Sequence, residues 1–235
     1  MELTADTHQN VLALMGMRVQ TLYCTDDNDR LLSVNESGFP QAPQFFMGRT
    51  ARGNIWHFRH DLPSELVQEL NQFCAMEPLS ADFATPPIHY HSIRKLLAEH
   101  EPIQHEYRGP AYLFPEKLPY SDKVVQLSEE MFHTYKGLKP VSAPRFPCVG
   151  VVEDKHIVSY CYCARLTEQA AEAGAETHPA FRGRGFAAKT AARWAMLIHE
   201  TGRIPFYSTW WDNHASQRVA DKLGLVLLGE DISII

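Results

Sequence analysis

A glycine-rich turn in the C-terminal third of the chain constrains the fold more than any other feature. The segment Phe181–Ala188 holds two arginines and two glycines, Arg182, Gly183, Arg184 and Gly185, between a predicted strand and a predicted helix. Such a turn leaves backbone N–H groups free, the start of the helix adds its positive dipole end, and the arginines add formal charge. The segment therefore predicts a site for a phosphate or pyrophosphate group.

The charge distribution supports this prediction. The chain carries 22 Lys and Arg against 28 Asp and Glu, a formal net charge of -6, which argues against nucleic acid and an anionic membrane surface as partners. Between Thr177 and His199, however, there is no Asp or Glu, and four basic residues gather there: Arg182, Arg184, Lys189 and Arg193. This basic segment on an acidic chain favours a small anionic ligand.

Composition indicates a globular chain of 235 residues, 45% hydrophobic, with material for one large or two small domains. No run approaches the roughly 20 apolar residues that cross a bilayer, and Met1–Asn10 lacks the basic-then-apolar order of a signal peptide, so we expect a cytoplasmic protein. The five cysteines are scattered without a C-x-x-C pair, which favours reduced thiols over disulfides or a zinc site.

Hydrophobic periodicity predicts two parts. Residues 1–104 form an accessory region with strands at Leu31–Val34, Gln44–Met47 and Asn54–Phe58 and helices at Pro63–Met76 and Ser92–His100. Residues 105–235 alternate strands and helices, which predicts an α/β or α+β fold. The strands are Pro110–Phe114, Val149–Glu153, His156–Ala164, Ala170–Thr177, Phe206–Trp210 and Leu225–Leu228, and the helices are Ser121–Lys136, Gly185–Glu200 and Asn213–Leu223.

The turn fits two families of motif. Gly183, Gly185 and Ala188 match the G-x-G-x-x-A turn of dinucleotide-binding domains, and Asp212 follows the next predicted strand, where an acidic residue would bind a ribose. A doubly wound domain, however, begins with this motif and needs roughly a hundred or more residues after it. Only 47 of the 235 residues follow Ala188, so a dinucleotide-binding protein is the less favoured alternative.

Read as Arg182-x-x-Gly185-x-Ala187, the same residues resemble the R/Q-x-x-G-x-G/A pyrophosphate loop of the GNAT superfamily of acyl-CoA-dependent N-acyltransferases. Thr177-His-Pro179 resembles the V-x-P element that precedes this loop. The segments Asn213-His-Ala-Ser216 and Lys222-Leu-Gly-Leu225 resemble the family's N-x-x-A/S and K-L-G-F elements. The resemblance covers roughly residues 105–235, and the chain looks like a bacterial subgroup with an extra N-terminal region.

The resemblance implies a mixed, mostly antiparallel central sheet flanked by helices, with two strands splayed apart around the pantetheine arm of acetyl-CoA. It implies an N-acetyltransferase that uses acetyl-CoA as co-substrate and transfers the acyl group to a primary amine of a small molecule or peptide. The N-terminal region would shape the acceptor pocket. The residues implied in cofactor binding are Thr177, His178, Pro179, Arg182, Gly183, Arg184, Gly185, Phe186, Ala187, Asn213 and Ser216.

One position departs from the family pattern. Many GNAT enzymes place a tyrosine seven residues after the asparagine, where it protonates the leaving thiolate, and here that position is Ala220. Water, Ser216 and Tyr207 remain candidate proton donors, and a thiol pKa of about 8.5 makes an unassisted thiolate a tolerable leaving group. The departure also leaves a second function open, a CoA-binding sensor or partner module without turnover.

Two glutamates are candidates for the general base. Strand alternation places Glu172 and Glu176 on one face of the strand before the loop. A carboxylate partly desolvated beside another carboxylate acquires a raised pKa, which suits a base working near neutral pH. Structural ion pairs with Arg145 or Arg165 are the alternative. We rank Glu172 first and Glu176 second, with His178 third.

Other candidate groups carry weaker signals. The pairs His57-x-x-His60 and His89-x-His91 lack the helical spacing of a zinc motif, so no metal site is predicted. Cys161 and Cys163 alternate onto one strand face and are interpreted as core thiols rather than acylation sites. Trp210 and Trp211 fit either stacking on an acceptor or on adenine, or a core or interface anchor.

Overall fold

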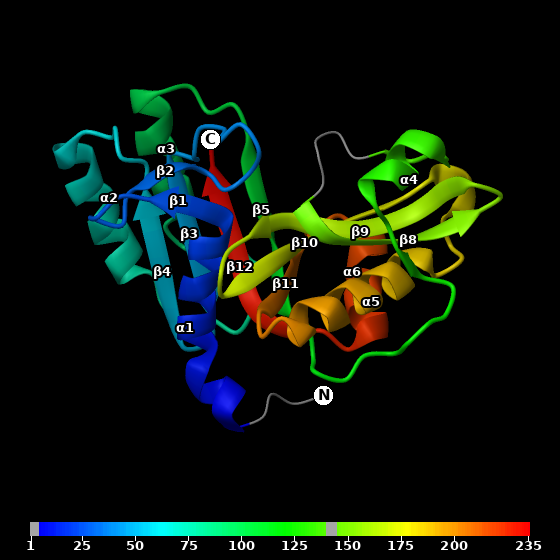
Figure 1. The fold of residues 1–235 in the computed structure, drawn as a ribbon. Helices are drawn as coiled ribbons and strands as arrows, with labels where there is room; N and C mark the ends of the chain where they lie inside the picture. The colour runs from blue at the N-terminus through cyan, green and yellow to red at the C-terminus, as the bar shows by residue number, and fades with distance from the viewer. Residues whose placement is uncertain (1–4, 140–144) are drawn as a thin grey trace. The chain divides into compact units, whose positions relative to one another are not determined.

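The computed structural model describes residues 5–139 and 145–235, and the chain divides into two compact units (Figure 1). Of the described residues, unit 1 contains 112–139, 145–208 and 213–226. Unit 2 contains 5–111, 209–212 and 227–235. Unit 2 therefore combines the two ends of the chain, and the glycine-rich turn lies in unit 1.

Unit 2 is a small sheet with helices on both faces. In chain order it holds α1 (Ala5–Leu22), β1 (Tyr23–Thr25), β2 (Leu31–Val34), β3 (Phe45–Thr50), β4 (Gly53–Phe58), α2 (Ser64–Met76), α3 (Tyr90–His100), most of β5 (Glu106–Leu113) and most of β12 (Val226–Ile234). Strands β4, β3, β12 and β5 neighbour one another in that order. Phe45 and Met47 of β3 pack with α2 and α3, whereas Phe46 packs with α1, so both faces of β3 are buried.

Unit 1 is a curved sheet that packs on one long helix. It holds β6 (Val125–Gln126), α4 (Glu129–Thr134), β7 (Lys136–Gly137), β8 (Arg145–Glu153), β9 (His156–Leu166), β10 (Ala170–Thr177), the short 3-10 helix η1 (Pro179–Phe181), α5 (Phe186–Glu200), β11 (Ile204–Ser208) and α6 (His214–Leu223). The strand order is β11-β10-β9-β8-β6, with β7 paired to β9. Helix α5 lies along β8, β9 and β10 (Figure 1) and buries Ala191, Trp194, Ala195 and Ile198 against them.

The predicted fold class is confirmed. Both units are mixed α+β, their sheets are mostly antiparallel, and helices flank them. Strand β10 pairs with β11, and β7 with β9, in parallel. Strand Ala170–Thr177 has the predicted bounds, and α5 begins one residue after its predicted start. The division of the chain at residue 104 stays a prediction.

The predicted helix Ser121–Lys136 is wrong, because β6, α4 and β7 occupy this segment. Its apolar residues are spaced as in one long helix. In the structure, however, some of them are buried from extended backbone and others from the short helix α4. Leu127 N donates to Cys148 O of β8 at 2.8 Å, so the sheet takes a hydrogen bond that a long helix would make internally. Ser128 then begins α4 by accepting a hydrogen bond from Met131 N at 3.4 Å.

Helix α1 is absent from the sequence prediction. Its buried side includes Arg18 and Thr21, both 1% exposed, beside Met15 and Val19. These polar residues interrupt the apolar stripe that identifies an amphipathic helix. Within the described ranges, no helix combines the length and the apolar character needed to cross a bilayer.

Candidate functional site

The glycine-rich turn of unit 1 leads from η1 into α5. Gly183 and Gly185 have φ angles of 79° and 75°, a backbone region that residues with a Cβ enter only with strain. Gly185 stands at the N-terminus of α5 without a side chain to cap the helix. The first N–H groups of α5 are therefore open to an anion, and Phe186 and Ala187 supply two of them.

Two arginines flank this turn, and both are exposed. Arg182 Nε donates to Thr177 O at 3.3 Å, which ties the turn to the end of β10. The Arg184 guanidinium lies 4.8 Å from the centre of the Phe181 ring and 3.9 Å from the Glu153 carboxylate. Because the Arg184–Glu153 pair is exposed, it contributes little to stability and leaves Arg184 able to turn toward a ligand.

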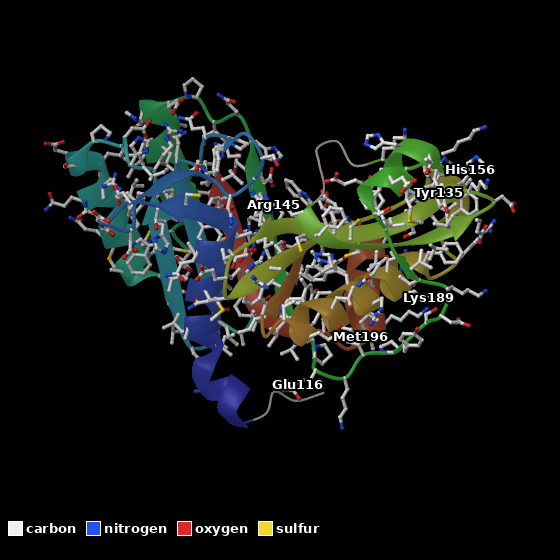
Figure 2. The ribbon with its side chains drawn as sticks, in the orientation of Figure 1. Glu116, Tyr135, Arg145, His156, Lys189 and Met196 are labelled. Atoms are coloured by element: carbon white, nitrogen blue, oxygen red, sulfur yellow. The ribbon has the colours of Figure 1, made fainter. Side chains whose placement is uncertain are left out.

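Two lysines add to the positive charge. A Cβ placed on Gly185 would lie 2.9 Å from Lys222 Nζ, so the ammonium of α6 reaches the N-terminus of α5. Lys189, labelled in Figure 2, holds its Nζ 5.9 Å from the centre of the Phe186 ring. In the sequence, Lys222 stands out only as part of the Lys222-Leu-Gly-Leu225 motif. Its position at the turn follows from the packing of α5 on α6, which local spacing does not reveal.

The residues before the turn shape the end of β10. Thr177 Oγ1 and Ser159 Oγ share a hydrogen bond of 2.8 Å. His178 begins η1, and its Nδ1 accepts from Ala180 N at 3.3 Å, while Pro179 occupies the first helical position. In this structure His178 therefore has a local capping role.

Strand β10 parts from β11 shortly after its start. In the described part of unit 1 the two strands pair only from Ala170 to Glu172, whereas β10 stays paired with β9 as far as Thr177. His178 N donates to Val158 O of β9 at 2.9 Å. Since N–H groups alternate between the two edges of a strand, the N–H groups that point away from β9 are those of Ala173, Ala175 and Thr177. These N–H groups line the edge of β10 from which β11 has parted, and this edge leads to the glycine-rich turn.

The two candidate bases have different surroundings. Glu172 is 2% exposed, and its Oε1 accepts from Ser208 Oγ at 2.7 Å. Glu176 is exposed, and its Oε2 accepts from Tyr160 Oη at 3.0 Å. Burial, together with the Glu176 charge and this hydrogen bond, raises the pKa of Tyr160, so its hydroxyl remains a donor at neutral pH.

The alternation of β10 agrees with the sequence analysis. Ala171 and Ala173 pack into the core that α5 covers, which leaves Glu172 and Glu176 on the opposite face. Four residues along a strand span about 13 Å, so the two carboxylates are too far apart to share a proton. Glu172 lies opposite Arg165 of β9 and is the last residue of β10 paired with β11.

The start of α6 holds the remaining predicted residues. Asn213 Oδ1 accepts from Ser216 N at 3.1 Å and caps the helix. Ser216 Oγ and Tyr207 Oη share a hydrogen bond, and burial raises the pKa of Tyr207 to about 12. Ala220, at the position of the family's tyrosine, is 1% exposed and lies in the core.

The structure thus gathers every predicted site residue in unit 1. Asp212, the acidic residue of the dinucleotide interpretation, belongs to unit 2. Cys161 and Cys163 are buried, and burial raises the pKa of Cys163 to about 11 and that of Cys161 well above its ordinary value, which makes both poor nucleophiles. Among the described residues, no three His, Cys, Asp or Glu side chains are placed to hold a metal ion.

Comparison with known proteins identifies the domain. The family model described as GNAT acetyltransferase matches residues 126–230, which include the end of β10, the glycine-rich turn and α6. No curated protein matches the chain.

Solved structures with similar folds are distant. A GCN5-related N-acetyltransferase-like protein from Streptococcus suis 89/1591 has 13% identity and a TM-score of 0.48, with 95% of this chain and 99% of that chain covered. A GCN5-related N-acetyltransferase from Kribbella flavida has 16% identity and a TM-score of 0.48, with 95% and 94% covered. A GNAT-family structure from Novosphingobium aromaticivorans DSM 12444 has 17% identity and a TM-score of 0.46, with 56% of this chain and 65% of that chain covered.

These structural similarities are remote, and the assignment of the domain rests on the family model and on the motifs within it. The family model thus identifies residues 126–230 of this chain as a GNAT acetyltransferase domain.

Proposed function

We propose that the protein is an acetyl-CoA-dependent N-acetyltransferase, with residues 105–235 as the acyltransferase domain and residues 1–104 as an accessory region. The parting of β10 from β11 after Glu172, in the strand that leads to the glycine-rich turn, carries this proposal. It leaves a strand edge with backbone donors that leads into a cationic helix N-terminus. Acetyl-CoA has the matching order of groups, an amide-containing arm joined to a pyrophosphate.

In this proposal, the N–H groups of Phe186 and Ala187 and the charges of Arg182 and Arg184 bind the pyrophosphate. Gly183 and Gly185 let the backbone approach it. Thr177, His178 and Pro179 border the arm at the end of β10, and Asn213 and Ser216 lie at the start of α6. Lys222 joins this set because its ammonium lies at Gly185.

The reaction forms a C–N bond to the thioester carbonyl carbon and breaks the C–S bond, so the ammonium must lose a proton and the thiolate must gain one. We assign the base to Glu172, which lies where β10 and β11 part, and keep Glu176 as the second candidate. For the thiolate, the candidates are Ser216, Tyr207 and water. With a pKa of about 12, Tyr207 keeps its proton at neutral pH and has one to donate.

A second function is favoured by one observation. Ala220 is buried where many relatives carry a tyrosine, which is consistent with a domain that binds CoA without turnover. Thiol release from acetyl-CoA distinguishes the acetyltransferase from the CoA-binding sensor. It is measured across a panel of amines, polyamines, aminoglycoside antibiotics and peptide N-termini. We expect amine-dependent thiol release with at least one class. Saturable CoA binding without release across the whole panel would favour the sensor.

A further inference from the structure

Unit 2 contains a pocket lined by none of the residues assigned above to cofactor binding or catalysis. Its volume is about 310 Å³, and the side chains relevant to its chemistry are Tyr90, Glu106, Arg108, Trp210, Trp211 and Asp212. They come from α3, β5 and the segment 209–212, all of which belong to unit 2. The pocket therefore combines aromatic rings with carboxylates.

Neighbouring groups hold the aromatic rings in place. The Trp210 ring lies edge-on to Tyr107 at 4.8 Å and to His105 at 5.2 Å, yet Trp210 remains 37% exposed. Trp211 Nε1 donates to Glu230 Oε1 at 2.8 Å. The Tyr90 ring already contacts one cation, because Arg108 Cζ lies 5.9 Å from its centre. These rings offer the electron-rich faces that attract cations.

The carboxylate of Glu106 is ionised and oriented. Tyr90 Oη donates to its Oε2 at 2.5 Å, and Arg94 Nε donates to its Oε1 at 2.7 Å. Burial acts to raise the pKa of Glu106, but these two hydrogen bonds and the charges of Arg94 and His91 together outweigh it and lower the pKa below its ordinary value. Glu106 is thus a fixed negative group in the pocket wall at neutral pH.

The positive charge of Arg108 is already engaged. Its Nη2 donates to Glu230 Oε1 at 2.5 Å, and Arg49 Nη1 donates to Glu230 Oε2 at 2.7 Å. Arg108 Nη2 also donates to the carbonyl oxygens of Phe83 and Ala84. Asp82 lies close enough to Arg49 for its charge to contribute to the lowered pKa of Asp82. Glu230 therefore bonds both arginines, and the exposed Asp212 adds a further negative group to the pocket lining.

We propose that this pocket binds the ammonium group of a primary amine, with Asp212 as its counter-ion and the faces of Trp210 and Tyr90 as its walls. Aromatic faces and a carboxylate together recognise an organic cation, whereas a neutral ligand gains only the apolar contact. The use of the bound amine as an acetyl acceptor rests on the proposed acetyltransferase function, but binding of the ammonium group does not.

Isothermal titration of the full chain with 2-phenylethylammonium tests this proposal. The matched probes are neutral 2-phenylethanol and anionic 3-phenylpropionate, which keep the ring and change the charged group. We expect the ammonium probe to bind at least about tenfold more tightly than either. Asp212→Asn and Trp210→Ala should each weaken it about three- to tenfold, the size of one ion-pair or cation–π contact. Asp27→Asn, an exposed carboxylate outside the pocket in the same unit, should leave it unchanged.

Equal affinity for the three probes, tighter binding of 3-phenylpropionate, or unchanged binding in both pocket variants would overturn the proposal. Titration of the same samples with acetyl-CoA keeps the two proposals distinguishable. Ammonium binding that depends on Asp212 without any acetyl-CoA binding would keep the pocket and reject the acetyltransferase. Acetyl-CoA binding without ammonium binding would do the reverse.

Discussion

Gly185 meets two demands at one residue. Its φ of 75° lies in the left-handed region, and a Cβ there would lie 2.9 Å from Lys222 Nζ. The left-handed backbone at Gly185 matters for the fold. The closeness of Lys222 matters for the anion site, because the flexible end of the lysine can move away from an added Cβ. A substitution at Gly185 should therefore harm ligand binding more than folding.

Gly185→Val tests this separation. The left-handed backbone should cost about 1–2 kcal/mol in the free energy of unfolding, while acetyl-CoA affinity falls by tenfold or more. Gly202 is the matched control, because it has a φ of 77° beyond the other end of α5 with open space around it. Gly202→Val should lose similar stability in urea titrations and keep its acetyl-CoA affinity. Equal affinities in both variants would remove Gly185 from the cofactor site.

The two glutamates can be separated by pH–rate profiles. Glu172→Gln should lower kcat and flatten its rise with pH, because a base that accepts the ammonium proton must be a carboxylate. The acetyl-CoA Kd should stay nearly unchanged, since Glu172 lies away from the turn. Full turnover of Glu172→Gln from about pH 6 to 9, with loss in Glu176→Gln, would exchange the roles. If neither variant lost activity, the amine would be deprotonated by water or arrive neutral.

At the scale of elements, α6 shows how one residue serves both folding and the site. Asn213 is predicted from the family motif as a cofactor residue, and in the structure it caps α6 through Ser216 N. Ser216 in turn bonds Tyr207 of β11 through its hydroxyl. The cap therefore fixes the position of a candidate proton donor.

Asn213→Ala should lower the free energy of unfolding by about 1 kcal/mol, the usual worth of a helix N-cap. Asn213→Asp keeps an oxygen acceptor at the cap and should retain most of that stability. Urea titration of the two variants measures the difference. Equal losses would mean that Asn213 stabilises α6 by something other than the cap.

Elements with strong local signals are the ones that the sequence predicts. Strand Ala170–Thr177 and helix α5 follow from small residues, glycines and a periodic apolar face. The same reasoning fails for the segment Ser121–Lys136, since its buried residues Leu127 and Phe132 pack against residues of β8 and β9, a contact that spacing does not encode. For the same reason, the sequence does not predict that Lys222 lies at Gly185 or that Glu106 and Asp212 line one pocket, because both depend on packing between residues distant in sequence.

On the scale of the whole molecule, the two chain ends share unit 2. Arg18 of α1 bonds Asp231 of β12 through Nε at 2.8 Å and Nη2 at 2.7 Å, with both side chains almost fully buried. Unit 2 is therefore complete only when β12, the last strand, has joined the helices and strands of the first hundred residues. Helix α1 is part of this unit's core.

Arg18→Met should cost about 3–5 kcal/mol in the free energy of unfolding, because it leaves the buried Asp231 carboxylate without its arginine. Adding Asp231→Asn should recover part of that loss by removing the charge. Arg52→Met, at an exposed turn, is the control and should change stability by less than about 0.5 kcal/mol. A loss below about 1 kcal/mol in Arg18→Met would mean that the Arg18–Asp231 ion pair contributes little to the stability of unit 2.

The most direct test of the proposed acetyltransferase is isothermal titration of the full chain with acetyl-CoA beside NADH, with thermal unfolding measured for both. The GNAT domain, the parted strands and the cationic turn predict saturable heat at one site and a raised Tm with acetyl-CoA, and neither with NADH. Heat and thermal stabilisation with NADH, and neither with acetyl-CoA, would contradict the proposed function and favour a dinucleotide-binding protein.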